Sequence, residues 1–198
     1  MLAFFFGGKP DGVVSAQFSD WVAMGVLTGV CLHQQNTTLD IVTGPPVYII
    51  PFTGHPDVEN KVMLTSGGAA VHAVVYWLET GSHNSPVYSE MNATHFIIRK
   101  QSDMSIIITQ PRALPSPKAD YFVIYGANDD DGNTYYVFYG FRWYGTMASA
   151  YQLLEWVQKS TLSLQTQGYQ IWMWTDTNGD GIVQPPGGGD TYTYMAGA

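Results

Sequence analysis

The segment KVMLTSGGAAVHAVVYWLE, residues 61–79, decides the expected fold. Its first part, Lys61–Thr65, is a largely apolar run and predicts a buried strand. Ser66, Gly67 and Gly68 then open a predicted helix over 69–79. Four apolar residues share one face of that helix: Val71, Val74, Val75 and Leu78. A strand, a Gly-Gly turn and a helix in direct succession are typical of a parallel sheet.

A second unit of this kind follows. The runs 121–126 and 134–139 predict two strands of a hairpin around the loop Asn128–Asn133. A helix is expected from about Met147 to Leu162, and then a strand over 169–174. The buried stripe of that helix is expected to be Ala150, Leu153, Leu154 and Val157. Two such crossovers predict a partly parallel sheet with helices on its faces.

Apolar runs elsewhere in the sequence predict the remaining strands and a first helix. Further strands are expected at 47–50, 94–98 and 105–108, and a first helix from Ser19 to about Gln34. The fold class expected is α/β. We expect a single three-layer domain over 13–198, with a mixed, partly parallel sheet, an antiparallel hairpin extension and an N-terminal apolar arm.

Composition excludes several classes of function. The 198 residues carry a net charge of −8, and only 12% of them are charged. Binding to nucleic acid is not expected from so acidic a chain. The apolar runs are too short for a transmembrane segment. The single cysteine rules out an internal disulfide framework and a four-cysteine zinc site.

Residues 1–12 predict an arm, because a short apolar tip precedes a Gly/Pro linker. The tip residues Leu2, Phe4, Phe5 and Phe6 would form an assembly contact by adding a strand to the open sheet edge of another copy. The alternative is an end strand packed into the core of its own chain.

A candidate calcium site lies near the C-terminus. The run DTNGDGI, residues 176–182, matches the first half of an EF-hand loop, with oxygens at positions one, three and five and a glycine at six. The expected ligands are Asp176, Asn178, Asp180, the carbonyl of Ile182 and, from further along, Asp190. Position twelve is Gly187 instead of Glu, so the loop is not an EF-hand. The alternative is a solvated turn rich in Asp and Asn.

Other signals concern localisation and catalysis. Asn36 and Asn92 begin glycosylation sequons, and together with the few charges and many hydroxyls they favour an extracellular or cell-surface protein. No signal peptide of the usual form is present. The five histidines have no zinc-ligand spacing, and the chain holds no GxSxG motif, so we do not expect an enzyme.

Three segments resemble archaeal surface-layer proteins and related extracellular structural proteins of the cell surface. They are VMLTSGGAAVHAVVYWLE (62–79), DYFVIYGANDDDGNTYYVFYGFRWYGTMASAYQLL (120–154) and WTDTNGDGIVQ (174–184). The Gly-Gly turn of that family is followed by Pro and Asn, where this chain has Ala69 and His72. The resemblance implies a structural role in a surface layer or filament, with no catalytic residues to carry over.

The expected function is therefore that of a secreted subunit that assembles with copies of itself into an extracellular filament or surface layer, with calcium as a possible cofactor. Two alternatives stay open. One is a monomeric, calcium-dependent module that binds cell-surface glycans or another ligand. The other is a metal-dependent hydrolase with its metal at Asp176, Asn178 and Asp180.

Overall fold

The computed structural model describes residues 2–5, 25, 59, 62–70, 72–81, 84–113, 115, 116, 118–159 and 168–198. The strands form a six-stranded mixed sheet of order β1-β2-β7-β6-β8-β9 and a three-stranded antiparallel sheet of order β3-β4-β5. The elements are β1 (Leu2–Phe5), β2 (Val62–Ser66), α2 (Ala73–Tyr76), the π-helical turn η1 (Trp77–Gly81), β3 (Val87–Met91), β4 (His95–Lys100), β5 (Ile106–Pro111), β6 (Ala119–Asn128), β7 (Thr134–Gly140), α3 (Trp143–Gln158), β8 (Tyr169–Thr175) and β9 (Thr191–Gly197).

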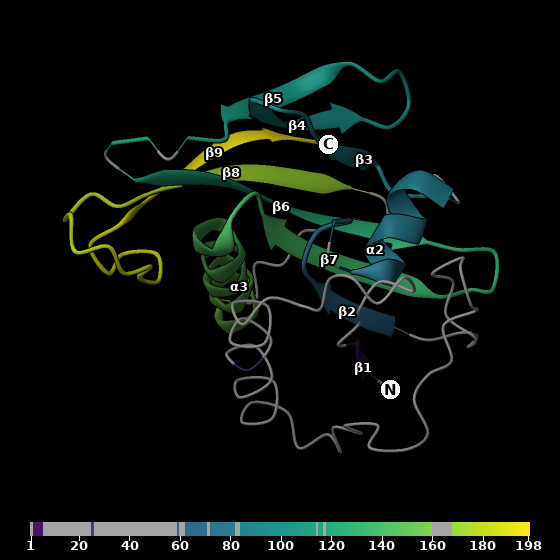
Figure 1. Cartoon of the computed structure of the whole chain (residues 1–198). Helices are drawn as coiled ribbons and strands as arrows, with labels where there is room; N and C mark the ends of the chain where they lie inside the picture. Colours follow the sequence, from purple (N-terminus) through teal and green to yellow (C-terminus); the bar gives the residue numbers. More distant parts are fainter. Residues whose placement is uncertain are drawn as a thin grey trace.

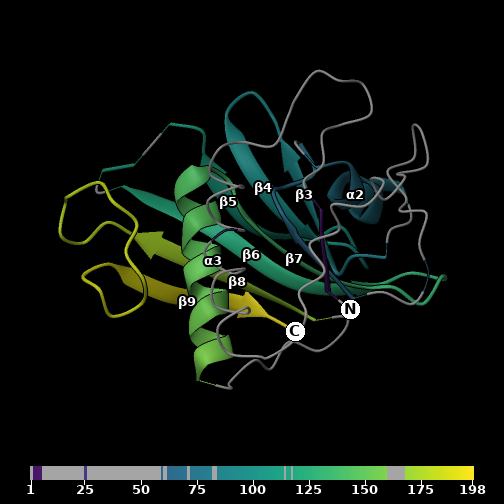
Figure 2. The same ribbon diagram turned by 90° about the horizontal axis from the view of Figure 1, so that it is seen from below.

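The expected three-layer α/β architecture is confirmed. Helix α3 covers one face of the six-stranded sheet, and the small sheet with α2 covers the other (Figure 1). Viewed from below, α3 runs across the strands of the large sheet (Figure 2). Each face has its own hydrophobic core, because alternate residues of the central strands point to opposite sides. Val123 and Tyr125 of β6 lie on the α2 side, while Phe122 and Ile124 lie on the α3 side.

The parallel strands are β1, β2 and β7, which are neighbours at one end of the strand order. β1 is parallel to β2, and β2 is parallel to β7. β6 is antiparallel to both β7 and β8, so those two strands run in the same direction and α3 is the crossover between them. The first unit differs from the prediction, because the chain after β2 and α2 enters β3 in the small sheet and does not return to the large one.

Two predicted helices change their bounds. The helix expected over 69–79 is only four residues of α2 followed by η1, although its stripe residues Val74, Val75 and Leu78 are buried as expected. The helix expected from Met147 begins already at Trp143 and ends at Gln158. Strands β3 and β9 were not predicted. The helix expected over 19–34, apart from the helical Gly25, and the strand expected over 47–50 lie outside the described residues.

Candidate functional site

The edge strand β9 is the most exposed strand of the large sheet for which side chains are described. Among the described strands it pairs only with β8, and it stands last in the order of the sheet. Its sequence, TYTYMAG, contains no charged residue and no proline. Tyr194 is 52% exposed and Met195 is 37% exposed. The outer backbone groups of β9 are thus flanked by uncharged side chains.

A row of aromatic side chains runs from α3 across β8 to β9. Trp156 of α3 contacts Trp172 of β8, with ring centroids 6.1 Å apart. Trp172 in turn meets the ring of Tyr194 edge-on at 5.4 Å. A register shift between Ile171 and Trp172 leaves Met195 unpaired in the ladder, so the strand bulges at this point. The row ends at the open edge of the sheet.

The predicted cation loop connects β8 to β9. The last ladder pair joins Thr175 to Thr191, so Asp176 and Asp190 face each other just beyond it. The Asp176 carboxylate is buried and accepts the backbone N–H of Gly179 at 2.8 Å and of Gly181 at 3.0 Å. Both glycines have positive φ, 75° and 76°, which the tight turn around the carboxylate requires.

Asp190 is the most informative residue of the loop. Its Oδ2 accepts Trp174 Nε1–H at 2.8 Å and the backbone N–H of Gln184 at 2.8 Å. Its Oδ1 is buried and has no donor within the described structure, and the same holds for Oε1 of Gln184. The Tyr192 hydroxyl donates to the Gln184 carbonyl at 2.6 Å. Burial raises the pKa of Tyr192, and the negative charge of the neighbouring Asp190 raises it further. Two buried acceptor oxygens of this loop, Asp190 Oδ1 and Gln184 Oε1, thus receive no hydrogen bond within the described structure.

The five predicted ligands are only partly brought together. Asp180 Oδ2 accepts hydrogen bonds from Asn178 Nδ2 at 3.0 Å and Gln184 Nε2 at 2.7 Å. The side chain of Ile182 is 62% exposed, as suits a residue that would use only its carbonyl. Within the described ranges, no three acidic or imidazole side chains form a metal-binding group. Gln184 was not among the predicted ligands, although it occupies position nine of the loop, a ligand position in EF-hand loops.

The remaining predicted residues are spread over the molecule. Leu2–Phe5 form β1 and pair with β2 of the same chain, as in the alternative of an end strand. Phe6 and Asn36 lie outside the described residues. Asn92 lies in the exposed turn between β3 and β4, where its Oδ1 accepts the backbone N–H groups of Thr94 and His95. This sequon is exposed on the protein surface.

Comparison of the chain with protein-family models, with curated proteins and with solved structures finds no match. The resemblance to archaeal surface-layer proteins therefore stays a prediction. Among the helices that the structure describes, none combines the length and apolar character needed to cross a membrane.

Proposed function

We propose that this protein is a structural subunit that assembles with copies of itself into an extracellular filament or surface layer, and that it does so through the edges of its six-stranded sheet. The observation that carries the proposal is β9, an exposed edge strand of seven residues with no charge and no proline. The low charge content and the sequon on an exposed turn support an extracellular setting.

Soluble proteins usually protect a sheet edge from pairing with another chain. They do so with lysines, prolines, short strands or a covering element, and a long uncharged edge strand is a template for a further strand. β9 carries a bulge at Met195 but none of the charged or proline protections. Tyrosine and methionine, which are exposed here, are enriched where proteins contact each other. The chemistry of β9 thus favours contact over solvation.

The opposite edge of the sheet supplies the second surface. β1 is the outermost described strand there, and its sequence, LAFF, is apolar. A contact of β1 with β9 of another copy joins two different surfaces, so each copy keeps one free edge for the next. Head-to-tail contacts of this type propagate into filaments unless the rotation closes a ring.

The proposal includes a hard cation in the loop that precedes β9. The buried, donor-free oxygens of Asp190 and Gln184 provide two ligand atoms, and Asp176, Asn178 and the Ile182 carbonyl would complete an oxygen shell. Ca²⁺ bound there would neutralise acidic side chains beside the edge strand and fix the β8–β9 hairpin. The cation would therefore favour assembly without itself forming the contact.

The test is sedimentation velocity and negative-stain electron microscopy of the full chain. Polymers are expected for the wild type, and Tyr194→Lys should abolish them because it places a charge on the edge strand. Tyr76→Lys is the matched control, since Tyr76 is 47% exposed and belongs to α2, not to either edge strand. Its polymers should be unchanged.

Deletion of residues 1–8 tests the other edge. The shortened chain should stay folded by circular dichroism and remain monomeric. A wild type that stays a single 21.8 kDa particle at all concentrations would contradict the proposal. Intact polymers in both Tyr194→Lys and the deletion variant would show that assembly uses other surfaces.

A further inference from the structure

The large sheet contains a topological switch point between β2 and β7. These two strands are parallel neighbours, with Ser66 paired to Phe138 near their carboxyl ends. After β2 the chain turns to α2 on one face, and after β7 it turns to α3 on the opposite face. When the connections of adjacent parallel strands leave on opposite sides, a crevice forms at their carboxyl ends, and α/β proteins bind ligands there.

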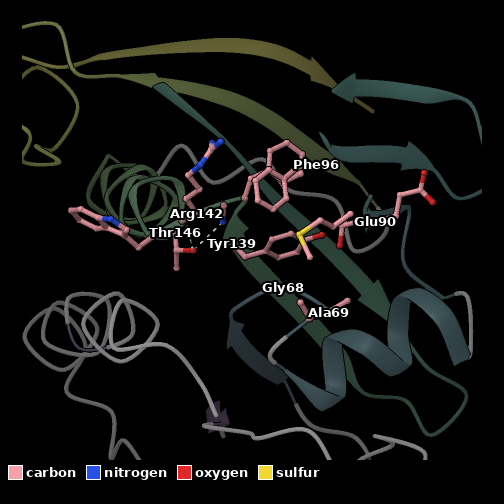
Figure 3. Close-up of a pocket in the computed structure, with 13 residues that line it drawn as sticks. Gly68, Ala69, Glu90, Phe96, Tyr139, Arg142 and Thr146 are labelled. Carbon is pink, nitrogen blue, oxygen red and sulfur yellow. Dashed lines mark hydrogen bonds between the residues drawn. The ribbon is translucent and has the colours of Figure 1, made fainter. Parts of the chain in front are cut away.

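A pocket of about 350 Å³ lies at this position (Figure 3). Gly68–Ala70 after β2 and Gly140–Trp143 after β7 form two of its walls. Met91 of β3 and Phe96 of β4 form the third wall. The volume is at the lower end of the range for small-molecule sites, enough for one ring-sized ligand. Three separate parts of the chain thus form the walls of the pocket.

The surface of this pocket is mainly aromatic and apolar. Phe96 stacks on Phe141 at a centroid distance of 5.2 Å and an interplanar angle of 14°. The ring of Tyr139 lies directly against Gly68, where an added Cβ would be 3.0 Å from the ring. Met91 and Trp143 add two large apolar side chains to the lining, 55% and 47% exposed. A flat apolar ligand would bury these side chains.

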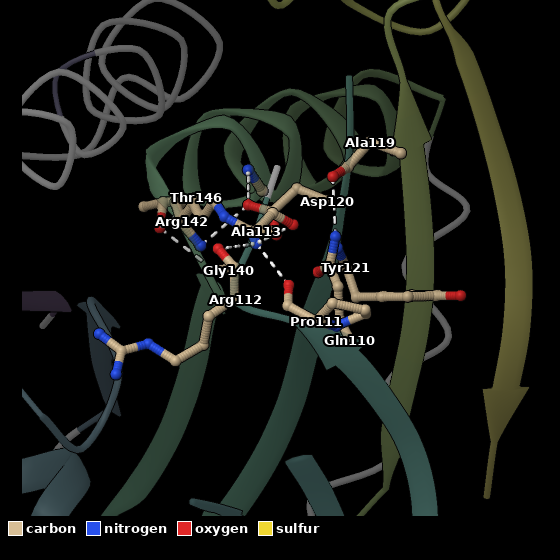
Figure 4. A network of polar contacts seen from close by, with 11 residues as sticks. Gln110, Pro111, Arg112, Ala113, Ala119, Asp120, Tyr121, Gly140, Arg142 and Thr146 are labelled. Atoms are coloured by element: carbon tan, nitrogen blue, oxygen red, sulfur yellow. Dashed lines mark hydrogen bonds and ion pairs between the residues drawn. The ribbon is translucent and has the colours of Figure 1, made fainter. Parts of the chain in front are cut away.

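The charged residues of the pocket are already paired. Arg142 Nη1 meets the buried Asp120 carboxylate at 3.4 Å, and Nη2 donates to the carbonyls of Pro111, Arg112 and Ala113 (Figure 4). Glu90 accepts Arg99 Nε–H at 2.8 Å, and Figure 3 shows its carboxylate pointing away from the other lining residues. No charge is left over for a charged ligand among the described lining residues.

The hydroxyl groups are engaged as well. Ser89 Oγ–H and Tyr139 Oη–H both donate to the buried Glu79, at 2.7 Å each. Thr146 Oγ1 accepts the backbone N–H of Gly140 at 3.1 Å and donates to the Arg142 carbonyl at 3.3 Å. A sugar would bring several hydroxyls into this pocket with few free partners, and unpaired polar groups in a buried site reduce affinity. This argues against a glycan here.

We infer that the pocket at the carboxyl ends of β2 and β7 binds a small, neutral aromatic compound, held against the Phe96–Phe141 pair and the exposed side chains of Met91 and Trp143. The inference is independent of the assembly proposed above, because neither β1 nor β9 lines the pocket. Aromatic rings stack favourably beyond the effect of their buried area.

The test uses the full chain with ¹³C-methyl-labelled methionine, in which Met91 reports on the pocket. Its NMR signal is assigned by Met91→Leu. Addition of p-cresol should shift the Met91 methyl signal saturably, with a Kd of about 1 mM or tighter, as expected for a ligand of this size. Methyl α-glucoside and benzoate serve as the hydroxyl-rich and charged probes, and neither should shift it.

Two phenylalanine variants complete the design. Ala70→Phe places a ring in the pocket mouth from an exposed position and should weaken p-cresol binding at least about tenfold. Ser116→Phe, on the exposed loop between β5 and β6, should leave binding unchanged. Absence of a p-cresol shift in the wild type, an equal shift in Ala70→Phe, or a response to the glucoside alone would overturn the inference.

Discussion

Tyr139 and Glu79, 60 residues apart in the chain, are joined by a hydrogen bond of 2.7 Å from the tyrosine hydroxyl to Glu79 Oε1. Both side chains are buried in the core between the two sheets. Ser89 donates to the same carboxyl through its backbone N–H and its hydroxyl, and Tyr125 Oη donates at 3.2 Å. Four donors thus surround an acid that lies in a π-helical turn, a local conformation often found at functional sites.

This arrangement predicts a pH-dependent stability. Burial raises the pKa of Glu79 from 4.5 to about 7, despite the hydrogen bonds that lower it. Between these two values the folded protein keeps a proton that the unfolded chain has released. The free energy of unfolding should therefore fall as the pH rises through this range, by about 3 kcal/mol for Glu79, and then level off.

Urea unfolding at several pH values measures this effect. Burial raises the pKa of Asp120 to about 7 as well, so the wild type should show both contributions with the same sign. Glu79→Gln should make the slope shallower and leave the Asp120 contribution, because the amide does not titrate. This holds whatever the effect of the substitution on absolute stability. Ile106→Val, at an exposed position without a titratable group, is the control and should keep the wild-type slope.

The two tyrosines that donate to Glu79 should contribute unequally to the free energy of unfolding. Tyr139→Phe removes the donor at 2.7 Å and should cost about 1–3 kcal/mol at neutral pH, since it leaves a buried acceptor with one partner fewer. Tyr125→Phe removes the longer bond at 3.2 Å and should cost less. Chemical unfolding of both variants gives the comparison, and an equal cost would contradict the ranking.

Gly140 should not tolerate a side chain. A Cβ at this residue would collide with the backbone of Gly145 and Thr146, where β7 meets α3. Gly140→Ala should cost about 3 kcal/mol or more, because backbone has to move. Gly187→Ala is the control, since nothing lies near its Cβ and only the φ of +84° is strained, a cost of about 1 kcal/mol. Thermal unfolding of the two variants distinguishes collision from strain.

The cation loop gives a further prediction. Ca²⁺ should raise the melting temperature of the chelator-treated protein, because a ligand that binds only the folded state stabilises it. Asp190→Asn should remove most of this response, since it replaces the carboxylate whose Oδ1 has no donor with a neutral amide. Asp130→Asn, in the turn between β6 and β7, should preserve it. The same melting temperature with and without millimolar Ca²⁺ in the wild type would exclude the site.

Periodicity predicted most of the fold. Strands β2, β4, β5, β6, β7 and β8 coincide with apolar or β-branched runs, and their turns coincide with Gly, Pro and Asn-Asp clusters. β3 and β9 were missed because SEM and TYT mix polar and apolar residues at exposed and partly exposed positions. The helix expected over 69–79 was too long, because its pattern continues through Glu79 and does not reveal that η1 turns this acid into the core.

The pocket could not be predicted from the sequence. Its walls come from Gly68–Ala70, Ser89–Met91, Phe96 and Tyr139–Trp143, and only the strand order brings these segments together. The pairing of Asp120 with Arg142 is hidden for the same reason, since it depends on how the start of α3 meets β6. The Gly-Gly turn after β2 was the one visible sign, and in the sequence it predicted only the passage from a strand to a helix.

The position of β2 beside β7 also bears on the order of folding. β6 and β7 form a hairpin across a short loop, whereas Val62 has to find Thr134, far along the chain. Pairing between distant segments is slow, because chain entropy is lost before the contacts form. The β6–β7–β8 meander is thus expected to form first, with the outer side of β7 open until β2 arrives. During synthesis, that interval is when β2 of another copy can take the place of the chain's own strand.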